Sequence, residues 1–142
     1  MLNLKIKFDF NSVKIISLFQ SIARVDVKDF FDLNSVYVFI VQKGQIGKAI
    51  GKNSSNVKTL ENKLKKKIRI IEFDENIDRF IRNIVYPSKL SEVSFDEENK
   101  VLTISGIDNK TRGYLIGRSA SNLRNNEFIL KRHYDVSELK VS

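Results

Sequence analysis

Two short segments of the chain combine a glycine, a cation and residues with short side chains. They are Gly51-Lys52-Asn53-Ser54 and Gly117-Arg118-Ser119-Ala120. Small residues let a phosphate oxygen approach the backbone closely, and lysine or arginine adds positive charge. A helix that begins just after such a loop presents unpaired N–H groups at its positive end. These residues at this spacing indicate phosphate-binding chemistry.

The two segments belong to a longer repeat with an offset of 66 residues, because residues 47–58 align with 113–124 without a gap. The identical pairs are Gly47/Gly113, Ile50/Ile116, Gly51/Gly117, Ser55/Ser121 and Asn56/Asn122. Cations also match, as in Lys52/Arg118 and Lys58/Arg124. The same offset continues through 64–66 and 130–132. Two copies of one supersecondary unit explain this pattern better than chance.

Hydrophobic periodicity predicts that each copy contains two strands, a helix, a tight glycine loop, a second helix and a strand. In the first copy the predicted ranges are strands 25–31 and 35–41, a short helix ending near Gly51, helix 55–66 and strand 68–73. In the second they are strands 89–95 and 100–105, helices 109–116 and 121–133, and strand 137–141. A strand over 3–8 and a helix over 13–24, capped by Ser12, precede the first copy. A further helix over 76–85 ends before Pro87.

Positive charge is concentrated around the two copies. The 142-residue chain carries a formal net charge of +8. Residues 43–69 contain nine lysines and arginines against one acid, and residues 110–132 contain six against one. Residues 70–109 carry nine acids and four bases. Two basic blocks separated by an acidic one favour a polyanionic partner over a uniformly solvated surface.

The remaining composition argues against an enzyme, a metal site or a membrane protein. Cysteine is absent and His133 is the one histidine, so nothing resembles a nucleophile–base pair. The loops lack the GxxxxGKS/T pattern of nucleotide hydrolysis. We interpret the acidic clusters at 74–78 and 96–98 as turn and helix N-terminal charges, and we expect His133 on the surface or at a helix cap. No apolar run approaches the roughly 18 residues of a membrane span, so we predict a cytoplasmic protein without cofactor or metal.

Two helices joined by a tight glycine-rich basic loop and packed on a small sheet resemble a KH domain. The segment Gly44-Gln45-Ile46-Gly47-Lys48-Ala49-Ile50-Gly51-Lys52, its tandem copy and the preceding helix resemble the archaeal NusA-like transcription factors, over residues 12 to 141. The resemblance implies an α+β fold of two tandem type II (prokaryotic) KH modules, each a small mixed sheet packed against helices. The first module, with its N-terminal helix, is expected over 1–86 and the second over 87–142. The resemblance also implies RNA binding and a role in transcription termination or antitermination.

A KH module holds about four nucleotides between its GXXG loop and a groove walled by sheet and helix. Each loop here keeps the first glycine and the basic residue, but has Ser54 or Ala120 in place of the closing glycine. If that position needs a positive φ, either residue is strained by about 1 kcal/mol. If it needs only a small side chain, both fit. Ser54 or Ser55, and Ser121, can also cap the following helix.

The predicted RNA-binding residues lie in both modules. They are Gly47, Lys48, Ile50, Gly51, Lys52, Asn53, Ser54 and Lys58 in the first, and Gly113, Ile116, Gly117, Arg118, Ser119, Ala120 and Arg124 in the second. Gly47 and Gly113 allow either close approach of RNA or close helix–strand packing. Tyr114, which matches Lys48, either stacks on a base or packs half-buried. Lysines 63 and 65–67 are expected to supply long-range attraction only.

We therefore predict a non-catalytic, monomeric factor that binds single-stranded RNA through two degenerate GXXG loops, with RNA polymerase as a further candidate partner. The alternative hypothesis is a KH-fold interaction module that docks on RNA polymerase with weak or no RNA binding. Its motive is the missing closing glycine, and the acidic segment 72–98 would then be the docking surface. A third hypothesis is a factor that binds structured RNA or assists ribosome assembly.

Overall fold

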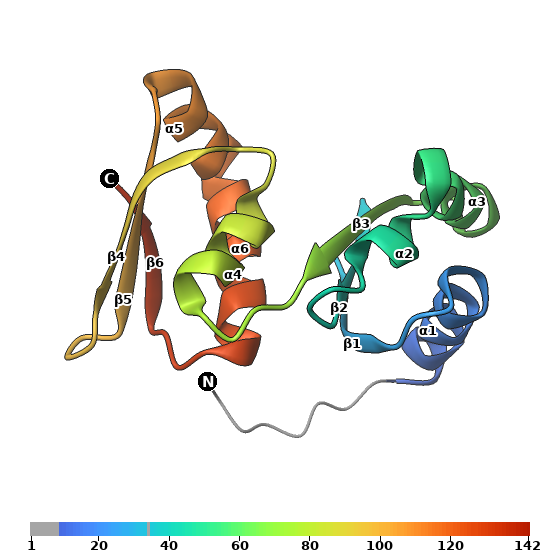
Figure 1. Ribbon diagram of the computed structural model, residues 1–142. Helices are drawn as coiled ribbons and strands as arrows, with labels where there is room; N and C mark the ends of the chain where they lie inside the picture. The colour runs from blue at the N-terminus through green and yellow to red at the C-terminus, as the bar shows by residue number, and fades with distance from the viewer. Residues whose placement is uncertain (1–8, 34) are drawn as a thin grey trace. The chain divides into compact units, whose positions relative to one another are not determined.

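The computed structural model describes residues 9–33 and 35–142. The chain folds as two compact units that divide between Asp74 and Glu75. Each unit has the same order of elements: a helix, two strands, two helices and a strand (Figure 1). This confirms the α+β class and the two tandem modules. The strand predicted over residues 3–8 lies outside the described residues.

The first unit contains α1 (Phe10–Ala23), β1 (Val27–Asp32), β2 (Val36–Val41), α2 (Ile46–Ile50), a 3-10 turn (Lys52–Ser54), α3 (Ser55–Leu64) and β3 (Lys67–Glu72). Its sheet has the order β1-β2-β3. β1 and β2 pair antiparallel, whereas β2 and β3 pair parallel. The parallel pairing requires a crossover, and α2 and α3 provide it. The predicted loop between these two helices therefore lies at the middle of the crossover.

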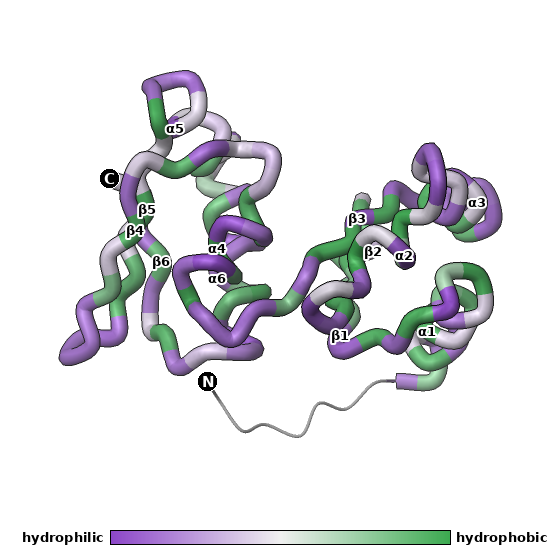
Figure 2. The backbone as a smooth tube through the Cα atoms, viewed as in Figure 1, coloured by the Kyte–Doolittle hydropathy of each residue, from purple (hydrophilic) through white to green (hydrophobic). Residues whose placement is uncertain are grey.

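The second unit repeats this topology with α4 (Ile77–Val85), β4 (Leu90–Asp96), β5 (Val101–Gly106), α5 (Asn109–Ile116), a 3-10 turn (Arg118–Ala120), α6 (Ser121–His133) and β6 (Glu138–Val141). β4 and β5 are antiparallel, and β5 and β6 are parallel. Asp96 closes the β4–β5 turn, hydrophilic in Figure 2, by accepting hydrogen bonds from the N–H groups of Glu98 (3.0 Å) and Asn99 (3.2 Å). This is the turn role predicted for the acidic cluster at 96–98.

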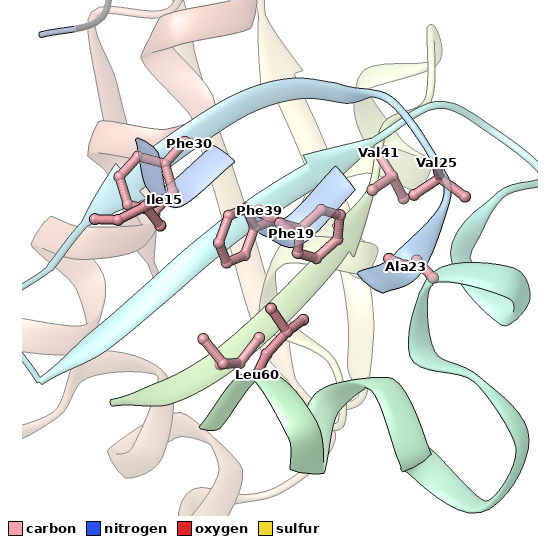
Figure 3. Close-up of a cluster of buried hydrophobic side chains, with 10 residues drawn as sticks. Ile15, Phe19, Ala23, Val25, Phe30, Phe39, Val41 and Leu60 are labelled. Atoms are coloured by element: carbon pink, nitrogen blue, oxygen red, sulfur yellow. The ribbon is translucent and has the colours of Figure 1, made fainter. Parts of the chain in front are cut away.

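The core of the first unit forms where α1 and α3 cover one face of the sheet. The ring of Phe19 stacks on that of Phe39 in β2, with 4.2 Å between centroids, and Leu60 of α3 packs in the same cluster (Figure 3). Ile15 of α1 is also buried in this cluster, and Leu18 packs against it. Burial of these large side chains supplies the main driving force for folding of this unit.

The start of α1 differs from the prediction. Asp9, and not Ser12, is the N-cap, because its carboxylate accepts a hydrogen bond of 2.7 Å from the N–H of Ser12. The helix consequently begins at Phe10. This hydrogen bond lowers the pKa of Asp9, because it favours the ionised carboxylate.

Helix α6 buries residues near its C-terminal end. Ile129, Leu130 and His133 face the core, while Phe128 remains 53% exposed. Helical spacing explains this, since 129, 130 and 133 share one face and 128 lies beside it. The prediction that His133 is a surface or capping residue is wrong: its ring lies edge-on to Phe80, with 5.8 Å between centroids.

The division between the units also falls earlier than the boundary predicted at residue 86. Helix α4 packs against α6, and the Phe80 ring lies 5.8 Å from both His133 and Tyr134. α4 therefore belongs to the second module, where it corresponds to α1 in the first. Pro87 marks the end of a helix and does not separate the modules. None of the helices in the described ranges has the length and apolarity needed to cross a membrane.

Replacing Phe80 by alanine tests this assignment of α4. We expect Phe80→Ala to lower the free energy of unfolding by about 3–5 kcal/mol, because the ring is fully buried against α6. Hydrogen exchange should show reduced protection in α6 and retained protection in α3. Arg79→Ala, on the exposed side of α4, is the matched control and should change little. Reduced protection confined to α3 would contradict the assignment.

Candidate nucleic-acid interface

The two predicted loops adopt one backbone conformation. Gly51 ends α2 with φ 80° and ψ 166°, and Gly117 ends α5 with φ 73° and ψ 175°. The third and fourth positions are left-handed in both copies, with φ of 54° at Asn53 and 53° at Ser119. The turn closes with hydrogen bonds from Ser54 N–H to Gly51 O (3.1 Å) and from Ala120 N–H to Gly117 O (3.2 Å). The sequence repeat is therefore also a structural repeat.

The fourth loop position requires a positive φ, which decides between the two alternatives left by the sequence. Ser54 and Ala120 both have φ of 60°. A residue with a Cβ is disfavoured there by roughly 1–2 kcal/mol, because its Cβ approaches the following carbonyl oxygen. The loops nevertheless keep the shape that a closing glycine would adopt freely. The replacement therefore changes the stability of the turn more than its geometry.

An asparagine in the following helix holds each turn in place. The Asn56 side-chain amide donates to the carbonyl oxygens of Lys48 and Ala49, both at 3.2 Å, and the Asn122 amide donates to that of Tyr114 at 2.7 Å. These carbonyls lie in the last turn of α2 and α5, where helical partners are missing. In the sequence this asparagine stands out only as an identical pair in the repeat, which predicts no particular role for it.

The same asparagines explain why glycine precedes the basic residue. A Cβ at Gly51 would lie 2.9 Å from Asn56 Cγ, and one at Gly117 would lie 2.7 Å from Asn122 Cγ. Glycine is thus required there by its positive φ and also by the packing of the amide.

Gly47 and Gly113 have open space beside them. A Cβ at either position would meet no atom within 4 Å, and both residues are exposed. The structure therefore gives no support to helix–strand packing as their role. The alternative, close approach of a partner to the helix backbone, is compatible with this open surface. Each glycine lies four residues before the first loop glycine, so this open surface is close to the loop.

The cations predicted to bind RNA surround these loops and are exposed. They are Lys48, Lys52 and Lys58 in the first module, and Arg118 and Arg124 in the second. Arg124 also forms an ion pair with Glu127, at 3.6 Å. Ile50 and Ile116, which end α2 and α5, are half-buried, as is Ala120, whereas Asn53, Ser54 and Ser119 are exposed. Each module therefore collects its predicted site residues on one exposed loop and the helix ends beside it.

The helices that follow the loops begin without a side-chain cap. Ser54 occupies the N-cap position of α3 in a left-handed conformation, and Ala120 occupies that of α6. In neither helix does the side chain of the N-cap residue accept a hydrogen bond from a backbone N–H of the first turn. The prediction that Ser54 or Ser55, and Ser121, cap these helices is therefore wrong. The N–H of the first residue of each helix donates to a carbonyl oxygen of the 3-10 turn, from Ser55 to Lys52 and from Ser121 to Arg118. The partial positive charge of the helix N-terminus still adds to that of the loop cation.

Different contacts support the start of the helix that precedes the loop, which is α2 in the first module and α5 in the second. In the first, the Gly44 N–H donates to Glu72 Oε2 at 2.9 Å, and Lys43 Nζ lies 3.6 Å from Asp74 Oδ2. In the second, the Asp108 carboxylate caps α5 by accepting a hydrogen bond from Thr111 N–H at 2.7 Å. That hydrogen bond lowers the pKa of Asp108, so this cap stabilises the fold at neutral pH and weakens as pH falls through that lowered pKa.

A second cationic feature lies at the other end of α3. It is a shallow hollow of about 640 Å³, lined by Ser35, Glu61, Lys65, Lys66 and Lys67. Glu61 Oε2 accepts a hydrogen bond of 3.0 Å from Ile68 N–H, and Lys66 Nζ lies 5.4 Å from the centre of the Tyr37 ring. The sequence predicted long-range attraction for lysines 65–67, and that remains a prediction.

Known proteins resemble this chain over almost its full length. A protein of Methanocaldococcus jannaschii named probable transcription termination protein NusA is 36% identical over 138 residues, which cover 96% of this chain and 75% of the relative. The chain belongs to the NusA family. The proteins of the same name from Methanococcus vannielii and Thermoplasma acidophilum are 32% and 22% identical. Those matches cover 97% and 96% of this chain, and 80% and 96% of the relatives. The resemblance to NusA-like factors found in the glycine segments is thus confirmed.

The chain also resembles a solved structure in its fold. The crystal structure of APE1850 matches with a TM-score of 0.77 and 23% identity, over 95% of this chain and 100% of that one. At this level of identity the likeness concerns the fold alone. No model of a protein family matches the chain.

Substitutions at the loop glycine and at the closing position should have opposite effects on stability. Ala120→Gly should raise the free energy of unfolding by about 0.5–1 kcal/mol, because relief of the left-handed strain exceeds the added entropy of the unfolded chain. Gly117→Ala should lower it by about 2 kcal/mol or more, because φ is positive and Asn122 fills the space.

Chemical denaturation of the full chain measures both effects, and Ser54→Gly and Gly51→Ala are the matched pair in the first module. Equal destabilisation by Ala120→Gly and Gly117→Ala would contradict the assigned roles.

Proposed function

We propose that this chain is a transcription termination or antitermination factor that binds single-stranded RNA through its two glycine–cation loops. The observation that supports this most directly is the repeated geometry: two loops of one conformation, each followed by a helix whose N-cap residue makes no side-chain hydrogen bond to the first turn. Exposed Lys52 and Arg118 stand at the same position in each loop. The arrangement fits two phosphates, one at each module.

The electrostatics of such a loop favour a phosphodiester. The aligned peptide dipoles of a helix place about half a positive charge at its N-terminus. α3 has 10 residues and α6 has 13, so both are long enough to contribute this effect. The lysine or arginine that precedes each helix adds a charge-assisted hydrogen bond to the same anion. Exposed Gly47 and Gly113 leave room for the rest of the nucleotide chain.

The part in transcription rests on the relatives. Proteins that share about a third of their residues with this chain are named probable transcription termination protein NusA. A factor with two tandem KH modules would act on the single-stranded transcript, because KH loops hold unpaired nucleotides. RNA polymerase is the further partner that this role implies.

The alternative, docking on RNA polymerase without RNA binding, has less support. Its first motive was the missing closing glycine, and both loops keep the turn without it. Its second was the acidic segment 72–98, but several of those acids have partners within the chain. Glu72 accepts from Gly44, Asp74 pairs with Lys43, and Asp78 pairs with Arg82 at 2.6 Å.

Reversal of the two loop charges tests RNA binding. The affinity of the full chain for a short single-stranded RNA should fall steeply with salt, because binding of phosphates releases counterions. Replacing Lys52 and Arg118 by aspartate should weaken binding by about 100-fold or more. The slope of log affinity against log salt should become shallower by about 1.4, which is about 0.7 for each phosphate that the variant no longer neutralises. Fluorescence anisotropy at several salt concentrations measures both quantities.

The matched control makes the same change of net charge outside the loops, with Lys14→Asp and Lys89→Asp. It should weaken binding only slightly, through long-range attraction. Equal weakening in both double variants would mean that the loops have no special role. If the loop variant still bound polymerase and still altered termination in a reconstituted transcription assay, the docking alternative would replace our proposal.

A further inference from the structure

At one position in the repeat the two copies have side chains of different chemistry, while the residues on either side of it are alike in character. Lys48 in α2 corresponds to Tyr114 in α5. The preceding residue is an open glycine in both copies, and the following residue, Ala49 or Leu115, is buried in both. The two side chains therefore start from equivalent points on their helices, beside the loop.

Tyr114 presents its ring to solvent. The residue is 64% exposed, which excludes half-buried packing as its role. A large aromatic residue that contributes little to the core leaves apolar surface available for a ligand. The adjacent Gly113 adds no side chain that would obstruct the approach.

The backbone beneath this ring is fixed. The Tyr114 carbonyl oxygen accepts the 2.7 Å hydrogen bond from Asn122, and Leu115 anchors the helix in the core. Tyr114 lies in the last turn of α5, so the ring rises from the part of the helix that leads directly into the loop. With the backbone held, stacking of a flat ligand has to restrict only the two side-chain torsions of the tyrosine.

We infer that Tyr114 is a base-stacking platform, so that the second module grips a nucleobase as well as a phosphate, whereas the first module, with Lys48 at the same point, grips the phosphate backbone alone. This inference rests on the proposed RNA binding and deepens it. Stacking on an aromatic side chain tolerates any base, because every base has a π-face. The two modules would then differ in what they require of the RNA: the first needs only charge, and the second needs an unpaired base.

The test uses the full chain, a short single-stranded RNA and an oligomer of equal length that lacks bases at its central positions. Tyr114→Ala should weaken binding to the RNA by roughly 5- to 100-fold, with an unchanged salt slope, because the same phosphates stay neutralised. Tyr114→Phe should retain most of the affinity. On the abasic oligomer the native chain should already be weaker, and Tyr114→Ala should cause no further weakening.

Lys48→Ala is the matched control in the first module. It should weaken binding to the RNA and to the abasic oligomer equally, and it should reduce the salt slope by about 0.7. Tyr114→Lys should bind the abasic oligomer better than the native chain does, with a steeper salt dependence. Thermal denaturation checks that the variants remain folded, which the exposure of Tyr114 leads us to expect.

The outcomes separate this inference from the proposed function. If Tyr114→Ala bound RNA as the native chain does while reversal of Lys52 and Arg118 abolished binding, the stacking role would be wrong and RNA binding would stand. A reduced salt slope in Tyr114→Ala would also overturn stacking. If Tyr114→Ala failed only to bind polymerase, the ring would contact protein and the stacking role would again be wrong. If the native chain bound neither oligomer, the proposed function itself would fail.

Discussion

Each loop depends on one hydrogen-bonded asparagine behind a glycine. The amides of Asn56 and Asn122 donate to carbonyl oxygens in the last turn of the helix before the loop, at 3.2 and 2.7 Å. Those carbonyls have no helical partner, and the amides also occupy the space beside Gly51 and Gly117. With the glycine and the amide in place, the chain can reverse within a few residues. The next helix then begins directly after the turn, with the exposed cation of the loop beside its positive end, which is the feature that a phosphate would use.

The sequence predicted the loops, the matched cations and almost every strand and helix, because glycine, charge and hydrophobic period are local properties. It did not predict the role of Asn56, whose acceptors lie seven and eight residues earlier and come close only after the turn forms. The sequence did not predict the burial of His133 either, because that burial follows from the packing of α4 on α6. The same packing places α4 in the second module, although the resemblance to tandem KH proteins led us to expect the boundary at residue 86.

The two modules form the same loop conformation, although different contacts hold the residues at the start of the helix before the loop. In the first, Glu72 and Asp74 at the end of β3 hold the residues before α2; in the second, Asp108 caps α5 from within its own segment. Closely similar loop dihedral angles in spite of these different entries indicate that the glycine and the asparagine determine the turn. The supports, and the side chain displayed at 48 and 114, are therefore free to differ. Differences in ligand preference between the modules are expected at such positions and not in the turn.

The missing closing glycine can be understood in the same terms. A residue with a Cβ stays in the left-handed region only where its surroundings over-determine the backbone. Ser54 and Ala120 are held there by the turn hydrogen bonds to Gly51 and Gly117 and by the helix that starts at the next residue. A glycine would adopt the same angles without strain, but it would also visit many others when the loop is free. Serine and alanine restrict those alternatives, so their presence makes the loop more rigid and leaves the position of the loop cation beside the following helix unchanged.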